Sequence, residues 1–325
     1  MKKLFLSLIA MAFATGMMAQ DSRVATLQHG TNFRTYYGTD AFISAHADAA
    51  DGDVITLTAG EFNCPEITKA LTIRGEGMRK TILRRAGGYI NIPKDSPYSL
   101  HIEGMTMDYR LIGGGGYMSI YFQSTGGSAT VTISKCLLVA AASVAFDNCN
   151  AVVIDSEIQN VSSSRNNSSI ICFNSKLTSL EGRTFDVNNC VITGNVTQAT
   201  NSIIKNSIVC DVSTLDNTNT TSNCLVKFDS SGFANSWYVK TEPDVNPDPW
   251  GEDPETPVLW ADLFGEDYHL TDAAASTYLG TDGTQVGIYG GAYPYDETPD
   301  YPLVKNLEVK GIHEDGKLQV KINVE

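Results

Sequence analysis

Hydrophobic and polar residues alternate along residues 100–209 in a unit that recurs along the chain. Each unit has two inward apolar residues two positions apart, a turn residue, a small residue, and an aliphatic residue three positions after the turn. From Lys135 onward, successive turn residues are 20, 19, 15 and 17 positions apart. The period of two predicts two short strands joined at a single bend in each unit. The turn residues are Gly104, Lys135, Asp155, Asn174, Asn189 and Asn206.

Strands account for this repeat better than helices, because β-branched residues dominate and 15–20 residues are too few for a strand, a helix and two loops. The pattern predicts an all-β parallel solenoid, in which each coil stacks about 4.8 Å above the last and equivalent residues form columns. Asn and Asp tolerate the left-handed backbone conformation that a sharp bend requires. We therefore interpret Asp155, Asn174, Asn189 and Asn206 as a structural bend ladder.

The seven cysteines fit the same interpretation, because Cys136 and Cys190 fall at the small position after a bend. These two residues lie three coils apart, about 14 Å at the stacking distance, which is too far for a disulfide. Most of the cysteines are expected to be buried and free. Bridges between residues 149 and 172 or between 210 and 224 remain open alternatives, and no Cys or His spacing indicates zinc.

Two segments resemble the start of right-handed parallel β-helix proteins of the pectate-lyase-like superfamily. They are "TDAFISAHADAADGDVITLTAGEF" at 39–62 and "ALTIRGEGMRKTIL" at 70–83. The resemblance implies a single-stranded right-handed β-helix whose open end is capped by a helix with Ala41, Phe42, Ala45 and Ala49 on its apolar face. Residues 263–291 resemble the last coil of such proteins. The superfamily includes lyases, glycoside hydrolases and non-catalytic adhesins, so the resemblance implies a fold and leaves the activity open.

The resulting organisation has five parts. Residues 1–19 read as a secretory signal peptide, because two lysines precede a short apolar run and small residues. We expect an exported chain, periplasmic or at the cell surface of a Gram-negative-type bacterium, without a transmembrane anchor in its mature form. Residues 20–53 form an N-terminal segment with the capping helix, and residues 54–240 form the coils. Residues 241–302 form an acidic segment, rich in Pro and aromatic residues, that wraps the coils and includes the last coil, and residues 303–325 form a β-hairpin.

The charge distribution limits the partners. The formal net charge is -14, becoming -16 without the two lysines of the signal peptide, and residues 241–304 hold 14 acidic residues and no Lys or Arg. Such a chain repels nucleic acid, so we expect none as a partner. An anionic polysaccharide would need a bound cation or a local basic patch, and one such patch is present in the sequence. It comprises Arg74, Arg79, Lys80, Arg84 and Arg85.

Candidate catalytic residues are few. Asp108 and Arg110 stand beside an insertion at 108–129, and Lys176 is expected one coil above Glu157 on the outer surface. A lyase needs a base to remove a proton alpha to a carboxylate together with a cation that neutralises this carboxylate. A glycoside hydrolase needs two carboxylates about 5–10 Å apart, and no acidic pair recurs in the outward columns.

Candidate binding residues come from the aromatic and acidic positions. Trp250 and Trp260 are either packing anchors or a carbohydrate platform. Phe173 belongs to an outward apolar patch that we expect a later segment or a partner protein to cover. Three acidic residues of the Pro-rich segment could hold Ca²⁺, the one candidate cofactor. These acidic residues are Asp244, Asp248 and Asp253. The outward apolar patch that contains Phe173 also contains Val152, Ile154 and Ile171.

The sequence favours a non-catalytic, glycan- or protein-binding component of the cell envelope that takes part in polysaccharide use. A polysaccharide lyase or glycoside hydrolase is the first alternative, and an adhesin or structural protein is the second. Convergent basic or acidic side chains near residues 108–129 would favour the enzyme.

Overall fold

The computed structural model describes most of the chain. The described residues are 22–85, 88–93, 96, 98–109, 119–124, 129–140, 143–163, 168–182, 184–211, 215, 217–227, 233, 236–239, 260–300, 304–312 and 318–324. Arg110, Asp244, Asp248, Trp250 and Asp253 lie outside these residues, so the expectations for them stay predictions.

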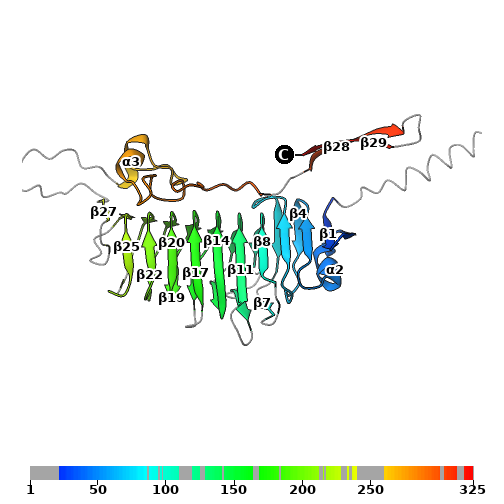
Figure 1. The fold of residues 1–325 in the computed structure, drawn as a ribbon, viewed down its shortest axis with the longest axis horizontal. Helices are drawn as coiled ribbons and strands as arrows, with labels where there is room; N and C mark the ends of the chain where they lie inside the picture. Colours follow the sequence, from blue (N-terminus) through cyan, green and yellow to red (C-terminus); the bar gives the residue numbers. More distant parts are fainter. Residues whose placement is uncertain are drawn as a thin grey trace, which may run out of the picture.

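The described chain winds through three sheets, whose strands stack along one long axis (Figure 1). Sheet A contains β1 (Val24–His29), β2 (Asn32–Tyr37), β3 (Val54–Leu57), β5 (Thr72–Gly75), β8 (Leu100–Glu103), β11 (Ala129–Ser134), β14 (Cys149–Ile154), β17 (Ser169–Phe173), β20 (Phe185–Asn188), β23 (Ile203–Lys205) and β25 (Thr220–Ser222). Sheet B contains β4 (Gly60–Asn63), β6 (Thr81–Arg84), β9 (Thr106–Asp108), β12 (Leu137–Val139), β15 (Glu157–Ile158), β18 (Lys176–Leu177), β21 (Val191–Ile192), β24 (Ile208–Val209), β26 (Leu225–Val226) and β27 (Trp237–Tyr238). Sheet C contains β7 (Gly88–Ile92), β10 (Ile120–Ser124), β13 (Val144–Asp147), β16 (Val161–Ser163), β19 (Leu180–Gly182) and β22 (Val196–Thr197).

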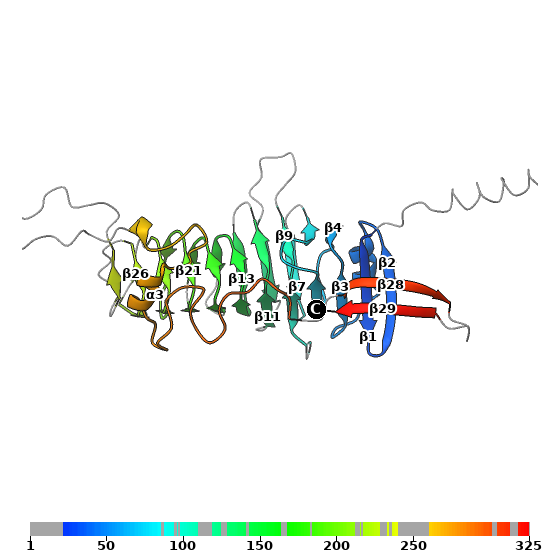
Figure 2. The ribbon, with the colours of Figure 1, turned by 90° about the horizontal axis from the view of Figure 1, so that it is seen from above.

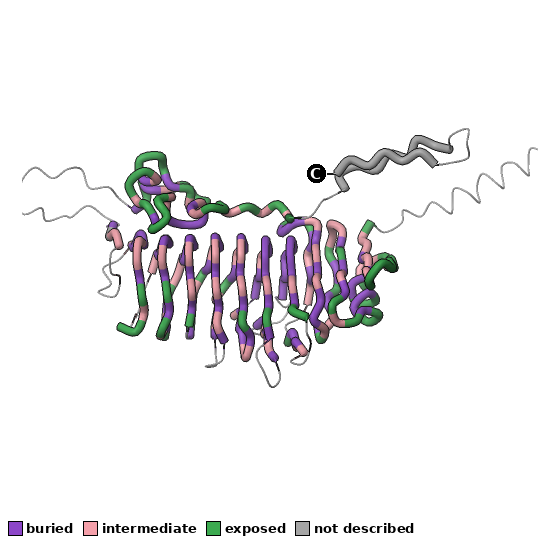
Figure 3. The backbone as a smooth tube through the Cα atoms, viewed as in Figure 1, coloured by how far each residue is buried: buried purple, intermediate pink, exposed green. Residues whose placement is uncertain are grey.

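Neighbouring strands are parallel in sheets B and C and through most of sheet A, as a β-solenoid requires. The registers predicted from the sequence are confirmed: Ile133 pairs with Val153, and Val153 pairs with Cys172. The sequence pattern predicts two strands in each coil, whereas six of the coils have a third strand in sheet C. In these six coils the core lies between three sheets, and Figure 3 shows buried and less buried positions alternating along the strands.

The bend ladder adopts the predicted backbone conformation. The φ angles are 48° at Asp155, 44° at Asn174, 52° at Asn189 and 52° at Asn206. Gly104 and Lys135 occupy the same bend position, with φ angles of 66° and 53°. We call these two residues and the bend ladder together the bend column. A positive φ costs a residue with a Cβ roughly 1–2 kcal/mol, and Asn and Asp reduce this cost through local hydrogen bonds.

The cysteines are free, as most were expected to be, and neither alternative disulfide forms. Six of them are buried, and Cys210 is partly buried. Burial raises the pKa of Cys136, Cys190 and Cys224 to about 12, which keeps these thiols protonated and unreactive at neutral pH.

A helix and an antiparallel hairpin occupy the N-terminal end of the sheets. The helix α2 (Ala41–Asp48) buries Ala41, Phe42 and Ala45 as predicted, and Ala49 is buried directly after it. The hairpin of β1 and β2 was not predicted; β1 pairs antiparallel with both β2 and β3. Together these elements take up the free edge that a first coil would otherwise present.

Residues 260–300, which we call the C-terminal strap, do not form the expected last coil. They contain η1 (Trp260–Asp262) and α3 (Asp272–Thr277) and contribute no strand to sheets A, B or C. Instead, the strap lies across the outside of the coils (Figures 1 and 2). Its apolar side chains form a cluster with Val191, Ile208 and Leu225 of sheet B. The strap therefore covers outward apolar residues of sheet B. Over the sheet A patch, which we expected a later segment or a partner to cover, strap residues 291–293 border a pocket together with Ile154 and Phe173.

The predicted C-terminal hairpin is confirmed. Strands β28 (Val304–Ile312) and β29 (Leu318–Val324) pair antiparallel with two register shifts. Across the part of the chain that the structure describes, no helix combines the length and apolar character needed to span a membrane.

Candidate functional site

The outer face of sheet C carries an ordered set of aromatic and amide side chains. Along β7, buried Ile90 and Ile92 alternate with outward Tyr89 and Asn91. Strand β10 repeats this alternation in register, with Tyr121 and Gln123 as its outward pair. On β13 the residues in register are Ala145, which is buried, and Asp147, which is half-buried.

Two tyrosines stack on this face. Tyr121 pairs with Tyr89 across the parallel strands, and their ring centroids lie 5.0 Å apart with an interplanar angle of 26°. Tyr89 is 50% exposed. On the inner side of the same sheet, Phe122 stacks on Phe146 in the core, so the outer tyrosine pair is an additional aromatic feature in contact with solvent.

A hydrogen-bonded row runs beside the tyrosines. Asn91 donates from Nδ2 to Oε1 of Glu66 at 2.5 Å, and Gln123 donates from Nε2 to Oδ1 of Asn91. Asp147 follows Gln123 in register on β13. These bonds fix the orientation of both amides. The row therefore presents a fixed set of donors and acceptors along the axis.

The described strands of this face carry a negative charge. The six strands of sheet C contain Asp147 and Glu181 and no Lys or Arg, and Glu66 adds a further carboxyl beside β7. The face is therefore suited to a neutral ligand and repels an anionic one.

The two catalytic candidates within the described residues, Asp108 and Lys176, do not lie together. Asp108 is 4% exposed and accepts a 2.5 Å hydrogen bond from Arg84, which also pairs with Glu61 at 2.8 Å. Lys176 lies three strands away from Asp108 in sheet B, with its Nζ 5.1 Å from the ring centroid of Tyr268. Asp108 thus belongs to an ion-pair network, and Lys176 rests on an aromatic ring.

Lys176 does lie beside Glu157 in register, as predicted. However, Glu157 accepts a hydrogen bond from Arg79 at 2.7 Å. Glu157 therefore forms its ion pair with Arg79 and not with Lys176, and Arg79 also reaches Glu297 of the strap at 3.3 Å.

The described binding candidates separate into two environments. Trp260 is 8% exposed and packs against Phe264 with ring centroids 5.2 Å apart, which is the environment of a packing anchor. Phe173 is half-buried and, with Ile154, borders a pocket under the strap. Among the described residues, no group of three or more His, Cys, Asp or Glu side chains is placed to hold a metal ion.

The bend ladder also anchors the strap, a role that the sequence analysis did not identify. Asn174 donates from Nδ2 to the carbonyls of Ile288 at 2.9 Å and Gly290 at 2.8 Å. Asn206 accepts a hydrogen bond from the Thr281 amide at 2.8 Å. The strap thereby runs back along the bend column, from the last coils towards β8.

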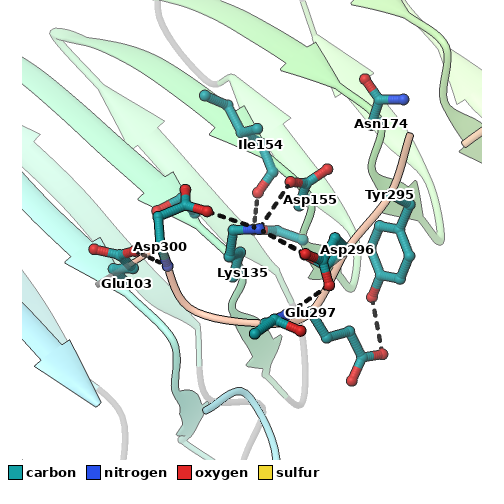
Figure 4. A network of polar contacts seen from close by, with 12 residues as sticks. Glu103, Lys135, Ile154, Asp155, Asn174, Tyr295, Asp296, Glu297 and Asp300 are labelled. Atoms are coloured by element: carbon teal, nitrogen blue, oxygen red, sulfur yellow. Dashed lines mark hydrogen bonds and ion pairs between the residues drawn. The ribbon is translucent and has the colours of Figure 1, made fainter. Parts of the chain in front are cut away.

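At Lys135 and Asp155 the same column is charged (Figure 4). Lys135, 4% exposed, places Nζ 3.4 Å from Asp155, 3.7 Å from Asp296 and 3.3 Å from Asp300. Burial raises the pKa of Asp155 to about 6, although Lys135 opposes this shift. Burial alone would raise the pKa of Glu103 too, but hydrogen bonds from His101 and the Asp300 amide hold it below its usual value.

The residues on sheet C were missed because their strands were not recognised. A signal was present: "YINI" at 89–92 and "YFQS" at 121–124 share an aromatic residue, an apolar residue and an amide in the same order. Function has to be inferred from this geometry, since no family model, no curated protein and no solved structure matches the chain.

Proposed function

We propose that this chain is a non-catalytic, glycan-binding β-solenoid that holds a neutral polysaccharide on the outer face of sheet C. The observation that carries the proposal is the stack of exposed Tyr89 on half-buried Tyr121, which continues into the hydrogen-bonded row of Asn91 and Gln123.

The chemistry of this face matches that of a sugar chain. A pyranose ring has an apolar C–H face that packs on an aromatic ring, and tyrosine combines such an apolar surface with a polar edge. The hydroxyl groups at the rim of the sugar need both donors and acceptors, which Asn and Gln side chains supply. Since the tyrosines and amides each recur from β7 to β10 along the solenoid axis, the face suits an extended polymer.

The acidic groups on this face favour binding over hydrolysis. Asp147 lies two strands from Asn91, about 10 Å at the usual strand spacing, and Glu66 lies on the other side of Asn91. The two carboxyls are therefore further apart than the roughly 5–10 Å that a glycosidase uses. The described residues of this face include no cation to neutralise a uronate, which a lyase requires.

The finer assignments of fold and location belong to this proposal. The parallel sheets support a right-handed, pectate-lyase-like β-helix, and the N-terminal apolar segment supports export to the cell envelope. An adhesin that binds a protein, or a structural protein, would not need this surface to bind a glycan. A measurement of glycan binding therefore separates these roles from the proposed one.

The test is affinity electrophoresis of the full chain through gels containing neutral or uronate polysaccharides. We expect retardation in at least one neutral gel, and the Tyr89→Ala/Tyr121→Ala variant should bind about tenfold or more weakly, since about 1.4 kcal/mol corresponds to a factor of ten. Tyr37→Ala is the matched control, because Tyr37 is 55% exposed on β2, away from this face.

Equal retardation of the double variant and the control would exclude this face as the binding site. An assay for unsaturated uronate products runs in parallel. Release of such products by the chain would overturn the non-catalytic part of the proposal.

A further inference from the structure

A pocket of 310 Å³ lies where the strap crosses the outer side of sheet A. Ile154 and Phe173 border it from β14 and β17, Asn188 borders it from β20, and Asp282 and Tyr293 border it from the strap. This pocket is separate from the tyrosine face, which belongs to sheet C. The pocket also includes Ile154 and Phe173 of the outward apolar patch, which we expected a later segment or a partner protein to cover.

The apolar walls of the pocket come from two different parts of the chain. Phe173 and Ile154 are half-buried, whereas Tyr293 is 83% exposed. An aromatic side chain this exposed gains little from packing within the chain, because its stabilisation scales with the apolar area removed from water. A ligand that covers Tyr293 would recover that area.

The polar side of the pocket is orientated by hydrogen bonds. Asp282 accepts at Oδ1 from the Thr284 amide at 2.9 Å and from its hydroxyl at 2.7 Å. Asn188 accepts at Oδ1 from Nδ2 of Asn206 at 3.0 Å. These contacts fix the remaining donor and acceptor directions of two side chains that border the pocket.

Two further residues that border the pocket have buried polar atoms without a hydrogen-bond partner in the protein. They are Oδ1 of Asp155 and Nδ2 of Asn189. Such atoms are rare in native structures, and each costs about 1–3 kcal/mol unless water or a ligand satisfies it. Both atoms are fully buried, so they lie behind the pocket wall, and the polar groups at the pocket surface are those of Asp282 and Asn188.

The size and charge of the pocket define the ligand class. Its volume is at the lower end of the roughly 300–1,000 Å³ typical of ligand pockets, so it suits a single ring. Its charged groups are Asp155 and Asp282, and neither Lys nor Arg borders it, which disfavours an anion. We infer that the pocket binds one neutral sugar ring, such as the end of a glycan, between Tyr293 and Phe173.

The test is a titration of the full chain with methyl glycosides of neutral hexoses, followed by calorimetry or NMR. Uronic acids and tetramethylammonium serve as anionic and cationic probes. We expect a neutral glycoside to bind, Tyr293→Ala to weaken this binding about tenfold, and Tyr37→Ala to leave it unchanged. Because Tyr293 is exposed, the thermal midpoint of Tyr293→Ala should match that of the unmodified chain.

Binding of tetramethylammonium in place of sugars would overturn the assignment of the ligand class. Sugar binding that survives Tyr293→Ala, or no binding by any probe, would overturn the pocket itself. The two proposals fail separately, since polymer retardation depends on Tyr89 and Tyr121 and glycoside binding depends on Tyr293. The Tyr89→Ala/Tyr121→Ala variant should therefore keep its affinity for the glycoside.

Discussion

Two parts of the bend column hold the same strap by different means. In the amide part, Asn174 and Asn206 bond neutral groups of residues 281–290. In the charged part, Lys135 and Asp155 meet Asp296 and Asp300. All four bend residues have positive φ angles, so the backbone requirement is common to both parts. The two parts differ in the strap groups that contact the covered side chains, which are neutral polar groups at Asn174 and Asn206 and carboxylates at Lys135.

This difference shows what an Asn and a Lys each require when they occupy a bend under the strap. An Asn at a bend satisfies the backbone and supplies a neutral donor and acceptor, so it needs only polar partners in the strap. A Lys gains no such backbone benefit, and its buried cation has to be neutralised. The strap supplies two carboxylates at this point, and the carbonyl of Asp296 accepts a further hydrogen bond from Lys135 at 3.1 Å.

The largest effect is expected from Lys135→Met, which keeps a long side chain at the bend but removes the buried cation. Asp155 is then left buried without its counter-charge, and loss of one partner of a buried pair costs about 3–5 kcal/mol. We expect the free energy of unfolding in urea to fall by about 4 kcal/mol. Limited proteolysis should also cut the strap earlier.

Lys176→Met is the matched control, because this lysine also lies under the strap but is only half-buried, against Tyr268. Its expected cost is below about 1 kcal/mol, the usual upper range for an exposed cation–π contact. Equal losses in the two variants would show that the charged part has no special dependence on its buried cation.

The bends could be predicted from the sequence because each one is set by local chemistry that recurs. Asn174 and Asn189 are each followed by a small residue and stand at the same offset from buried aliphatic residues. The strands of sheet C escaped detection because their distance from the bend varies. Strand β16 starts six residues after Asp155, whereas β10 starts sixteen residues after Gly104.

The path of the strap could not be predicted for a related reason. Asn174 bonds the backbone carbonyls of Ile288 and Gly290, and a carbonyl carries no side-chain signature. The segment also resembles a last coil in sequence, yet its apolar residues pack on Val191 and Ile208 from outside. Periodicity reports the burial of a residue, and it does not distinguish the inside of a coil from a second layer over it.

Asn174 offers a way to separate the two roles of an amide bend. Asn174→Gly keeps the positive φ accessible but removes the bonds to Ile288 and Gly290, and at about 1 kcal/mol for each bond we expect a loss of about 2 kcal/mol. Asn174→Ala should lose about 1 kcal/mol more, because Ala also carries the cost of the left-handed backbone. Urea unfolding of both variants measures the difference.

Proteolysis of the strap supplies the second readout. Both variants should release the strap to a similar extent, since both lack the same two bonds. Asn174→Gly could instead be as stable as the unmodified chain and equally resistant to proteolysis. The Asn174 amide would then support only the bend and not hold the strap, and the two parts of the column would differ less than proposed.

The smallest effect is expected from pH, and it should appear only in the charged part. The pKa of Asp155, near 6 in the folded chain, is above the ordinary value of 3.8, so the folded state binds this proton more tightly than the unfolded state. Its contribution to stability therefore rises as pH falls from about 7 to 4. Between pH 7 and pH 5 it amounts to about 1 kcal/mol. The groups that face Asp155 are Lys135, Asp296 and Asp300.

Asp155→Asn isolates this contribution, because it installs the amide that the rest of the column already uses. The comparison is needed because His46, whose pKa burial lowers to about 4, destabilises the fold as pH falls through the same window. This effect is common to both chains and cancels in their difference. The unfolding free energy of the unmodified chain, relative to Asp155→Asn, should therefore rise by about 1 kcal/mol from pH 7 to pH 5. A difference that stays constant with pH would show that Asp155 titrates normally, and the charged part would then respond to pH no more than the amide part does.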